Sequence, residues 1–149
     1  MVEIAFYHLE SSTLEVTLPR LLEKTLDGGN RALVLATSMD LLEQMDDFLW
    51  AYKNNSWLPH GLQRDPLAEE QPILLATSPE AMNGAKYLFL IDGVVTDQIE
   101  KFERCFEIFN GKDSNAIHAA RKSWSRYKAQ QYSMTYWQED LNGRWQKKE

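Results

Sequence analysis

Residues 32–49 read ALVLATSMDLLEQMDDFL, and this stretch sets the fold class because it joins a strand to a helix. The run Ala32–Ala36 is wholly apolar, which is typical of a strand buried on both faces of a sheet. Thr37 or Ser38 can cap the helix that follows. That helix keeps its large apolar side chains on one face, namely Leu41, Leu42, Met45, Phe48 and Leu49. A buried strand followed by an amphipathic helix predicts an α/β fold.

The residues before this stretch show the same order of elements. Ile4–His8 predicts a short buried strand, and Ser11–Thr13 breaks the chain after it. The next helix is expected to close at Gly28 and Gly29. Its apolar side chains recur at helical spacing, namely Leu18, Leu21, Leu22 and Leu26. The order strand, helix, strand, helix predicts a mostly parallel central sheet with helices on both faces.

The middle of the chain is predicted to combine a loop with three more strands. Residues 51–71 show little periodicity, so we expect a long connecting loop of the kind that often carries function. Ile73–Ala76 and Tyr87–Ile91 predict two buried strands. Arg104–Phe109 alternates like a strand, although a helix from Asp97 onward is an alternative.

The C-terminal part is predicted to be a helix followed by a weakly ordered tail. Asp113 and Ser114 open a helix that we expect to run through about Tyr132. Residues 136–149 are expected to be only marginally ordered. No internal repeat or linker divides the 149 residues, so the sequence predicts a single domain over residues 1–149.

The composition excludes several classes of protein. No window approaches the roughly 18 unbroken apolar residues that cross a bilayer, so we expect no contact with a membrane. Glu3 stands where a signal peptide would carry basic residues. Cys105 is the single cysteine, which excludes an internal disulfide and a cysteine-built zinc site, and we expect its thiol to be buried and inert. These features predict a cytoplasmic protein.

The net charge of −6 argues against a protein that coats duplex nucleic acid. Residues 1–111 hold eight Lys and Arg against 18 Asp and Glu, whereas residues 112–149 hold eight against four. An acidic body with a basic, aromatic C-terminal segment predicts a local anion-binding surface. A solvated helix face is the alternative interpretation.

The sequence carries no recognisable site for nucleotide binding, metal binding or covalent catalysis. It lacks the phosphate-loop and dinucleotide motifs, and the turn Leu9–Thr13 is acidic and has no glycine. Asp92 ends an apolar strand as the magnesium-holding acids of P-loop ATPases do, but without a phosphate loop we interpret it as a turn residue. His8, His60 and His118 lack the spacing of metal ligands. We therefore expect no metal, no cofactor and no enzyme activity.

The final helix carries a candidate binding face. Arg121, Trp124 and Lys128 lie at i, i+3 and i+7, so an aromatic ring falls between two cations, and Ser125 shares their face. This face suits an acidic peptide with an aromatic side chain, because the ring takes the apolar part and the cations take the carboxylates. The stripe expected to face the sheet consists of Ala120, Tyr127 and Gln131.

Two tryptophans lie close together in the sequence around the end of the second predicted helix. Trp50 ends that helix, and Trp57 follows in the predicted loop. They are either core residues or anchors of a protein interface, where tryptophan is over-represented.

Several motifs in order carry a family resemblance. They are Ala5-Phe6-Tyr7 with Leu33–Ala36, Ser56-Trp57-Leu58-Pro59-His60-Gly61 after Leu49-Trp50, Pro72–Leu75, and Ala120-Arg121-x-x-Trp124-x-x-Tyr127-Lys128 with Tyr136-Trp137-Gln138 beyond. The second is similar to an S-F-L-P-H-G turn, and the last to an A-R-x-x-[WY]-x-x-Y-[KR] ending. Because these motifs occur in this order and with these spacings, the chain resembles the chi subunit family of bacterial DNA polymerase III. Members of this family are accessory subunits of the clamp-loader complex.

The resemblance implies a Rossmann-like fold without a phosphate-binding loop and a protein without catalysis of its own. It implies that the chain binds the acidic C-terminal tail of single-stranded DNA-binding protein and links it to the DNA polymerase III complex, meeting DNA only indirectly. The tail pocket maps onto Arg121 and Trp124, with Lys128 nearby and an apolar residue of the preceding strand, placed at Phe109. Ser125 stands where some relatives carry a lysine, so one cation is absent.

The resemblance also implies a second surface, which binds the psi subunit or, in some members, a helicase-like protein. It maps onto Trp50 and Trp57, with Pro59 and His60 of the same motif. Two alternatives stay open: a degenerate nucleotide-binding or nucleotidyl enzyme on the same fold, and a direct single-strand binder. The latter would stack bases on Trp124, Tyr127 and Tyr132.

Overall fold

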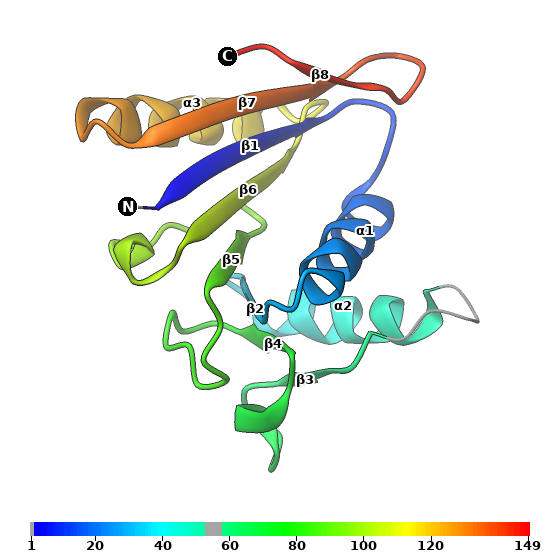
Figure 1. The fold of residues 1–149 in the computed structure, drawn as a ribbon. Helices are drawn as coiled ribbons and strands as arrows, with labels where there is room; N and C mark the ends of the chain where they lie inside the picture. Colours follow the sequence, from blue (N-terminus) through cyan, green and yellow to red (C-terminus); the bar gives the residue numbers. More distant parts are fainter. Residues whose placement is uncertain (1, 53–57) are drawn as a thin grey trace.

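The computed structural model describes residues 2–52 and 58–149, which form one eight-stranded sheet with helices packed on it (Figure 1). The strand order is β3-β4-β2-β5-β6-β1-β7-β8, and the neighbouring pairs are parallel except for β7 with β8. The strands are β1 (Glu3–Leu9), β2 (Ala32–Leu35), β3 (His60–Leu62), β4 (Ile73–Ala76), β5 (Tyr87–Leu90), β6 (Arg104–Asn110), β7 (Ser133–Glu139) and β8 (Trp145–Lys147). The helices are α1 (Leu14–Asp27), α2 (Met39–Ala51) and α3 (Ser114–Ala129), with short 3-10 turns η1 (Ala68–Glu70) and η2 (Ile99–Lys101). The predicted α/β fold with a mostly parallel sheet is confirmed.

Helices cover both faces of the sheet, as predicted (Figure 1). On one face, Leu18 of α1 and Met45 of α2 share a core with Phe89 of β5. On the other face, Tyr127 of α3 shares a second core with Phe6 of β1. None of the helices in the described part of the chain has the length and apolar character that a membrane crossing requires.

Two helix starts follow the capping signals in the sequence. The hydroxyl of Ser38 accepts a hydrogen bond from the amide of Leu41 at 3.4 Å at the start of α2. The carboxylate of Asp113 accepts one from the amide of Asn115 at 2.9 Å at the start of α3. Each cap satisfies a backbone donor that the first helical turn leaves without a partner.

Two strands lie where the sequence predicts irregular chain. β3 falls inside residues 51–71 and pairs with β4 at the sheet edge, so this segment is not a continuous loop; three residues are too few to show alternation. The tail prediction was wrong, because residues 133–139 form β7 and pair along the length of β1. Gln131 was also misplaced: it lies beyond α3 with a φ of 65°, so it does not continue the buried stripe.

The sheet changes winding direction between β1 and β6, which are neighbours in it. The chain leaves β1 towards α1 on one face and leaves β6 towards α3 on the other (Figure 1). In open α/β sheets, ligands usually bind at the carboxyl ends of two such diverging strands.

Candidate binding surfaces

Trp124 of α3 packs edge-on against two rings of the sheet. Its ring centroid lies 5.3 Å from that of Phe6 in β1 and 5.6 Å from that of Tyr136 in β7, at interplanar angles of 73° and 81°. Phe6 is fully buried, whereas Trp124 is half-buried. One part of the indole therefore holds α3 on the sheet, and the rest of its surface stays open to a ligand.

Tyr136 joins Trp124 to a second group of side chains at the ends of β1 and β6. Its hydroxyl lies 2.7 Å from Nδ1 of His8, and its ring centroid lies 6.2 Å from that of Phe109. The chain at Gly111 passes so close that a Cβ there would lie 2.2 Å from the His8 ring. The His8 imidazole is therefore fixed between two aromatic rings and the backbone.

The predicted tail-binding residues divide into exposed and supporting ones. Arg121, Ser125 and Lys128 are exposed on α3. Burial raises the pKa of the Tyr136 hydroxyl, and the charge of Arg121 acts in the opposite direction. Phe109 exposes only 7% of its surface and its ring lies 4.9 Å from that of His8, so it supports the cluster from below.

Sequence reasoning missed Tyr136 and His8 as members of this cluster. The signal was present in β7, where Met134 and Tyr136 face the α3 core while Trp137 faces the other one. This alternation is typical of a strand that is half-covered on each face.

The structure contradicts a base-stacking platform built on Trp124, Tyr127 and Tyr132. Tyr127 exposes only 2% of its surface, and its ring packs against Phe6. The hydroxyl of Tyr132 donates a hydrogen bond to Glu100 at 2.7 Å. A base cannot reach the Tyr127 ring without opening the core.

Trp50 presents a second surface at the end of α2. Its side chain is 60% exposed, and its ring centroid lies 4.1 Å from that of His60. His60 is buried, with Nδ1 2.7 Å from the carbonyl oxygen of Leu58 and Nε2 3.0 Å from the Asp46 carboxylate. Pro59 is half-buried beside it. Trp57, predicted to belong to this surface, lies outside the described residues, so the structure brings together only part of the predicted set.

The turn after β1, where nucleotide-binding relatives of this fold hold phosphate, is filled by a carboxylate of the chain itself. Oε1 of Glu139 accepts hydrogen bonds from the amides of Glu10, Ser11 and Ser12 at 3.1, 3.0 and 2.8 Å, and Oε2 accepts one from the Ser12 hydroxyl. Burial of Glu139 acts to raise its pKa, but these hydrogen bonds outweigh it and the pKa is lowered. Backbone amides that would hold a phosphate are therefore already occupied.

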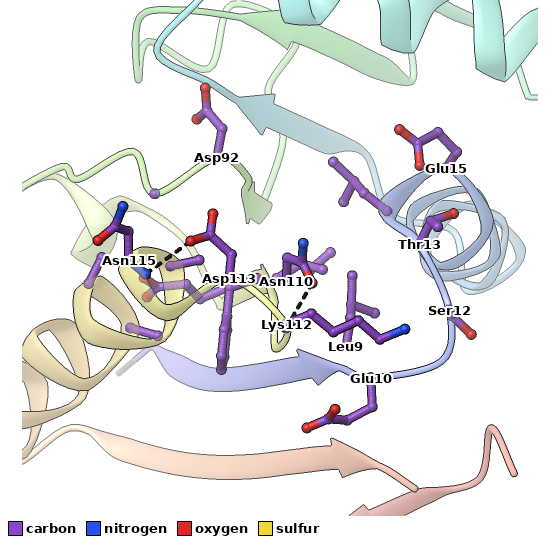
Figure 2. Close-up of a pocket in the computed structure, with 18 of the residues that line it drawn as sticks. Leu9, Glu10, Ser12, Thr13, Glu15, Asp92, Asn110, Lys112, Asp113 and Asn115 are labelled. Atoms are coloured by element: carbon purple, nitrogen blue, oxygen red, sulfur yellow. Dashed lines mark hydrogen bonds between the residues drawn. The ribbon is translucent and has the colours of Figure 1, made fainter. Parts of the chain in front are cut away.

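A pocket of about 760 Å³ lies at the carboxyl ends of β1 and β6, next to this turn (Figure 2). Its lining residues include five acids, namely Glu10, Glu15, Asp92, Glu107 and Asp113, and one cation, Lys112. The carboxylate of Glu10 is paired with Nε2 of His8 at 2.9 Å. Asp92 has a φ of 55° and accepts hydrogen bonds from the amide and hydroxyl of Thr37, in agreement with its interpretation as a turn residue.

Two other chemical possibilities find no support in the described residues. No group of three or more His, Cys, Asp or Glu side chains in residues 2–52 and 58–149 is placed to hold a metal ion. Cys105 is a free thiol, fully buried, and burial raises its pKa well above the ordinary value, so it is protonated and unreactive.

Comparison with known proteins gives the family. The sequence profile described as "DNA polymerase III chi subunit, HolC" matches residues 1–135. A relative described as a probable DNA polymerase III subunit chi, from Rickettsia prowazekii (strain Madrid E), is 25% identical over 109 residues, which are 73% of this chain and 66% of the relative. The alignment thus spans just under two thirds of that relative's length. The profile covers most of the chain and agrees with the resemblance carried by its motifs: the chain belongs to the DNA polymerase III chi subunit family, accessory subunits of the bacterial replication machinery.

Proposed function

We propose that this chain is a non-catalytic adaptor that binds the acidic C-terminal tail of single-stranded DNA-binding protein and links it to the clamp loader of DNA polymerase III. In this role it meets DNA only through its partners. One observation carries the proposal: exposed Arg121 and half-buried Trp124 lie one turn apart on the same side of α3, and the Trp124 ring packs on that of Tyr136. Membership of the chi family supports the link to the polymerase.

The chemistry of this face fits a peptide that ends in acidic residues and an aromatic one. The guanidinium of Arg121 can hold the terminal carboxylate with two parallel hydrogen bonds. The open part of the Trp124 indole can pack on the last side chain. Lys128 is exposed one turn beyond Trp124 on α3, and its charge attracts the other carboxylates of the peptide. So small a contact predicts an affinity on the order of micromolar.

A second protein partner, such as a psi subunit or a helicase-like protein, is proposed to bind at the end of α2. Trp50 is 60% exposed there, and Phe48 of the same helix is 45% exposed. Large exposed apolar side chains of this kind are typical anchors of protein interfaces. Because α2 and α3 lie on opposite faces of the sheet (Figure 1), both partners can bind at the same time.

Isothermal titration of the tail peptide into single-residue variants tests the proposed tail site. Arg121→Ala is expected to cost about 2 kcal/mol of binding free energy, because the carboxylate loses its bidentate partner. Lys128→Ala should cost less and mainly weaken the dependence on salt. Lys122→Ala removes another exposed cation of α3, on a different side of the helix, and is the control. If Arg121→Ala binds as tightly as the Lys122→Ala control, the tail site lies elsewhere.

A further inference from the structure

Residues 136–149 lie beyond the part of the chain that the family profile matches, and they complete one edge of the sheet. Here β8 pairs with β7 on the side away from β1, and the chain after β8 continues along β7 (Figure 1). The amide of Lys148 donates a hydrogen bond to the carbonyl oxygen of Tyr136 at 2.7 Å, so these two residues are neighbours across the strands. This edge therefore borders the ring on which Trp124 packs.

Lys148 lies on the same face of the sheet as α3. The residue before it, Lys147, is paired with Trp137, whose ring belongs to the core under α1 and α2. Because successive side chains of a strand point to opposite faces, Lys148 points to the α3 face, as Tyr136 does. A contact along the strand agrees with this placement: Nζ of Lys148 donates a hydrogen bond to Oε1 of Gln146, two residues earlier, at 3.2 Å.

Tyr136 is a fixed aromatic ring with Trp124 on one side and Lys148 on the other. Trp124 reaches it from the β1 side, where it also packs on Phe6, and Lys148 borders it from the β8 side. The Tyr136 ring stacks on that of Phe6 at 6.2 Å with an interplanar angle of 10°, and its hydroxyl lies 2.7 Å from Nδ1 of His8. Because Tyr136 is only half-buried, it adds a preformed apolar surface next to the indole.

The charges that act on Tyr136 come from α3, from the turn after β1 and from the end of the chain. Burial raises the pKa of its hydroxyl, the charge of Arg121 lowers it, and the charges of Glu10 and Glu149 raise it. Lys148 is exposed, and the hydrogen bond that its Nζ donates goes to a neutral amide, so that bond does not neutralise its charge. An acidic ligand at this edge is therefore attracted by Lys148 and opposed by Glu149.

We propose that Tyr136 and Lys148 form the second half of the tail site. The Tyr136 ring extends the apolar surface of Trp124, and Lys148 binds a side-chain carboxylate of the tail. This inference rests on the proposed function, in which Arg121 holds the terminal carboxylate. Arg121 then recognises the end of the peptide, and Lys148 recognises that the residues before the end are acidic.

Isothermal titration at physiological ionic strength with two peptides tests the role of Lys148. The peptides are acetyl-Asp-Asp-Asp-Ala-Phe and acetyl-Asn-Asn-Asn-Ala-Phe, both with a free terminal carboxylate. Lys148→Ala is expected to weaken binding of the aspartate peptide about threefold, the size of an exposed ion pair, and to leave binding of the asparagine peptide unchanged.

Lys147→Ala is the matched control, because it removes the same charge one residue away on the other face of the sheet. It should bind both peptides like the wild type. Equal affinity of Lys148→Ala and Lys147→Ala for the aspartate peptide overturns the proposal. An equal loss with both peptides in Lys148→Ala overturns it as well, since Lys148 would then not bind the side-chain carboxylates.

Two further positions test the surroundings of Lys148. Tyr136→Phe keeps the ring and should bind like the wild type, whereas Tyr136→Ser removes it and should weaken binding of both peptides at least about threefold. Glu149→Gln removes the opposing charge and should tighten binding of the aspartate peptide alone. Wild-type affinity in Tyr136→Ser with the fold intact by thermal unfolding, or weaker binding in Glu149→Gln, contradicts the proposal.

Arg121→Ala separates this inference from the proposed function. It should weaken binding of both peptides, because both keep the terminal carboxylate. If Arg121→Ala weakens binding and Lys148→Ala does not, the tail site stays on α3 and the role of Lys148 is wrong. If Lys148→Ala weakens binding of the aspartate peptide and Arg121→Ala does not, the edge of the sheet binds acidic chains and the role of Arg121 is wrong. Failure of the wild type to bind either peptide overturns both.

Discussion

Two carboxyl groups are buried among the described residues, and their surroundings shift their pKa values in opposite directions. Glu139 exposes 2% of its surface, yet its pKa is lowered because the hydrogen bonds from the turn after β1 outweigh burial. Glu107 exposes 6%, and burial raises its pKa from 4.5 to about 7, against a smaller effect of Ser123 and Arg126. The hydrogen-bond donors around each carboxyl group, rather than its degree of burial, decide which of the two stays ionised.

The raised pKa of Glu107 predicts that stability depends on pH in a defined window. The folded protein binds this proton more tightly than the unfolded chain, so the free energy of unfolding falls as pH rises from about 4.5 to about 7 and levels off above it. The change amounts to about 3 kcal/mol at most. Urea denaturation at pH 5 and pH 8 measures it. Glu107→Gln should remove this slope, and exposed Glu103→Gln should keep it; the same slope in both variants would assign it to another group.

At the scale of the elements, Glu139 ties the end of β7 to the turn between β1 and α1. Glu139→Ala leaves three amides and the Ser12 hydroxyl without their acceptor and should destabilise the fold by about 2 kcal/mol. Glu139→Gln keeps a carbonyl acceptor and should lose less. Urea denaturation measures both, with exposed Glu80→Ala as control. A Glu139→Ala protein as stable as the Glu80→Ala control would show that water replaces the carboxylate without cost.

Elements with a regular hydrophobic pattern were predictable from the sequence. Strands that owe their order to pairing with a neighbouring strand were not. The apolar runs of β2 and β4 and the capped stripes of α2 and α3 follow from hydrophobic pattern and capping residues, which act locally. β3 is three residues long, and pairing with β4 defines it. β7 is half-buried over most of its length and gains its order from β1, about 130 residues earlier in the chain. Such long-range pairing leaves little signal in a single sequence.

Local sequence pattern likewise predicts only part of the candidate tail-binding site. Arg121 and Trp124 share a helix, so their spacing alone predicts a common face. His8 and Tyr136 meet because β1 and β7 are neighbours in the sheet, and no local pattern brings these two residues together.

At the scale of the whole molecule, the two proposed partner surfaces lie on opposite faces of the sheet and are expected to act independently. Trp50→Ala should weaken binding of the second protein partner and leave the affinity for the tail peptide unchanged. It should cost about 1 kcal/mol or less in stability, because the ring is 60% exposed and its contact is with His60. Thermal unfolding and titration with each partner measure these effects. A fold that collapses on this change, or a tail affinity that drops with it, would contradict two separate surfaces.

In the proposed adaptor, α3 binds both the terminal carboxylate and the last aromatic ring of an acidic tail. Isothermal titration with two peptides tests this binding mode: one is the complete tail ending in phenylalanine, and the other is the same peptide without that residue. We expect binding on the order of micromolar for the complete peptide and a loss of at least about tenfold for the shortened one, because the ring contact with Trp124 disappears and the terminal carboxylate moves away from Arg121. Equal binding of the two peptides would mean that α3 attracts acidic chains by charge alone and has no pocket for the last aromatic ring.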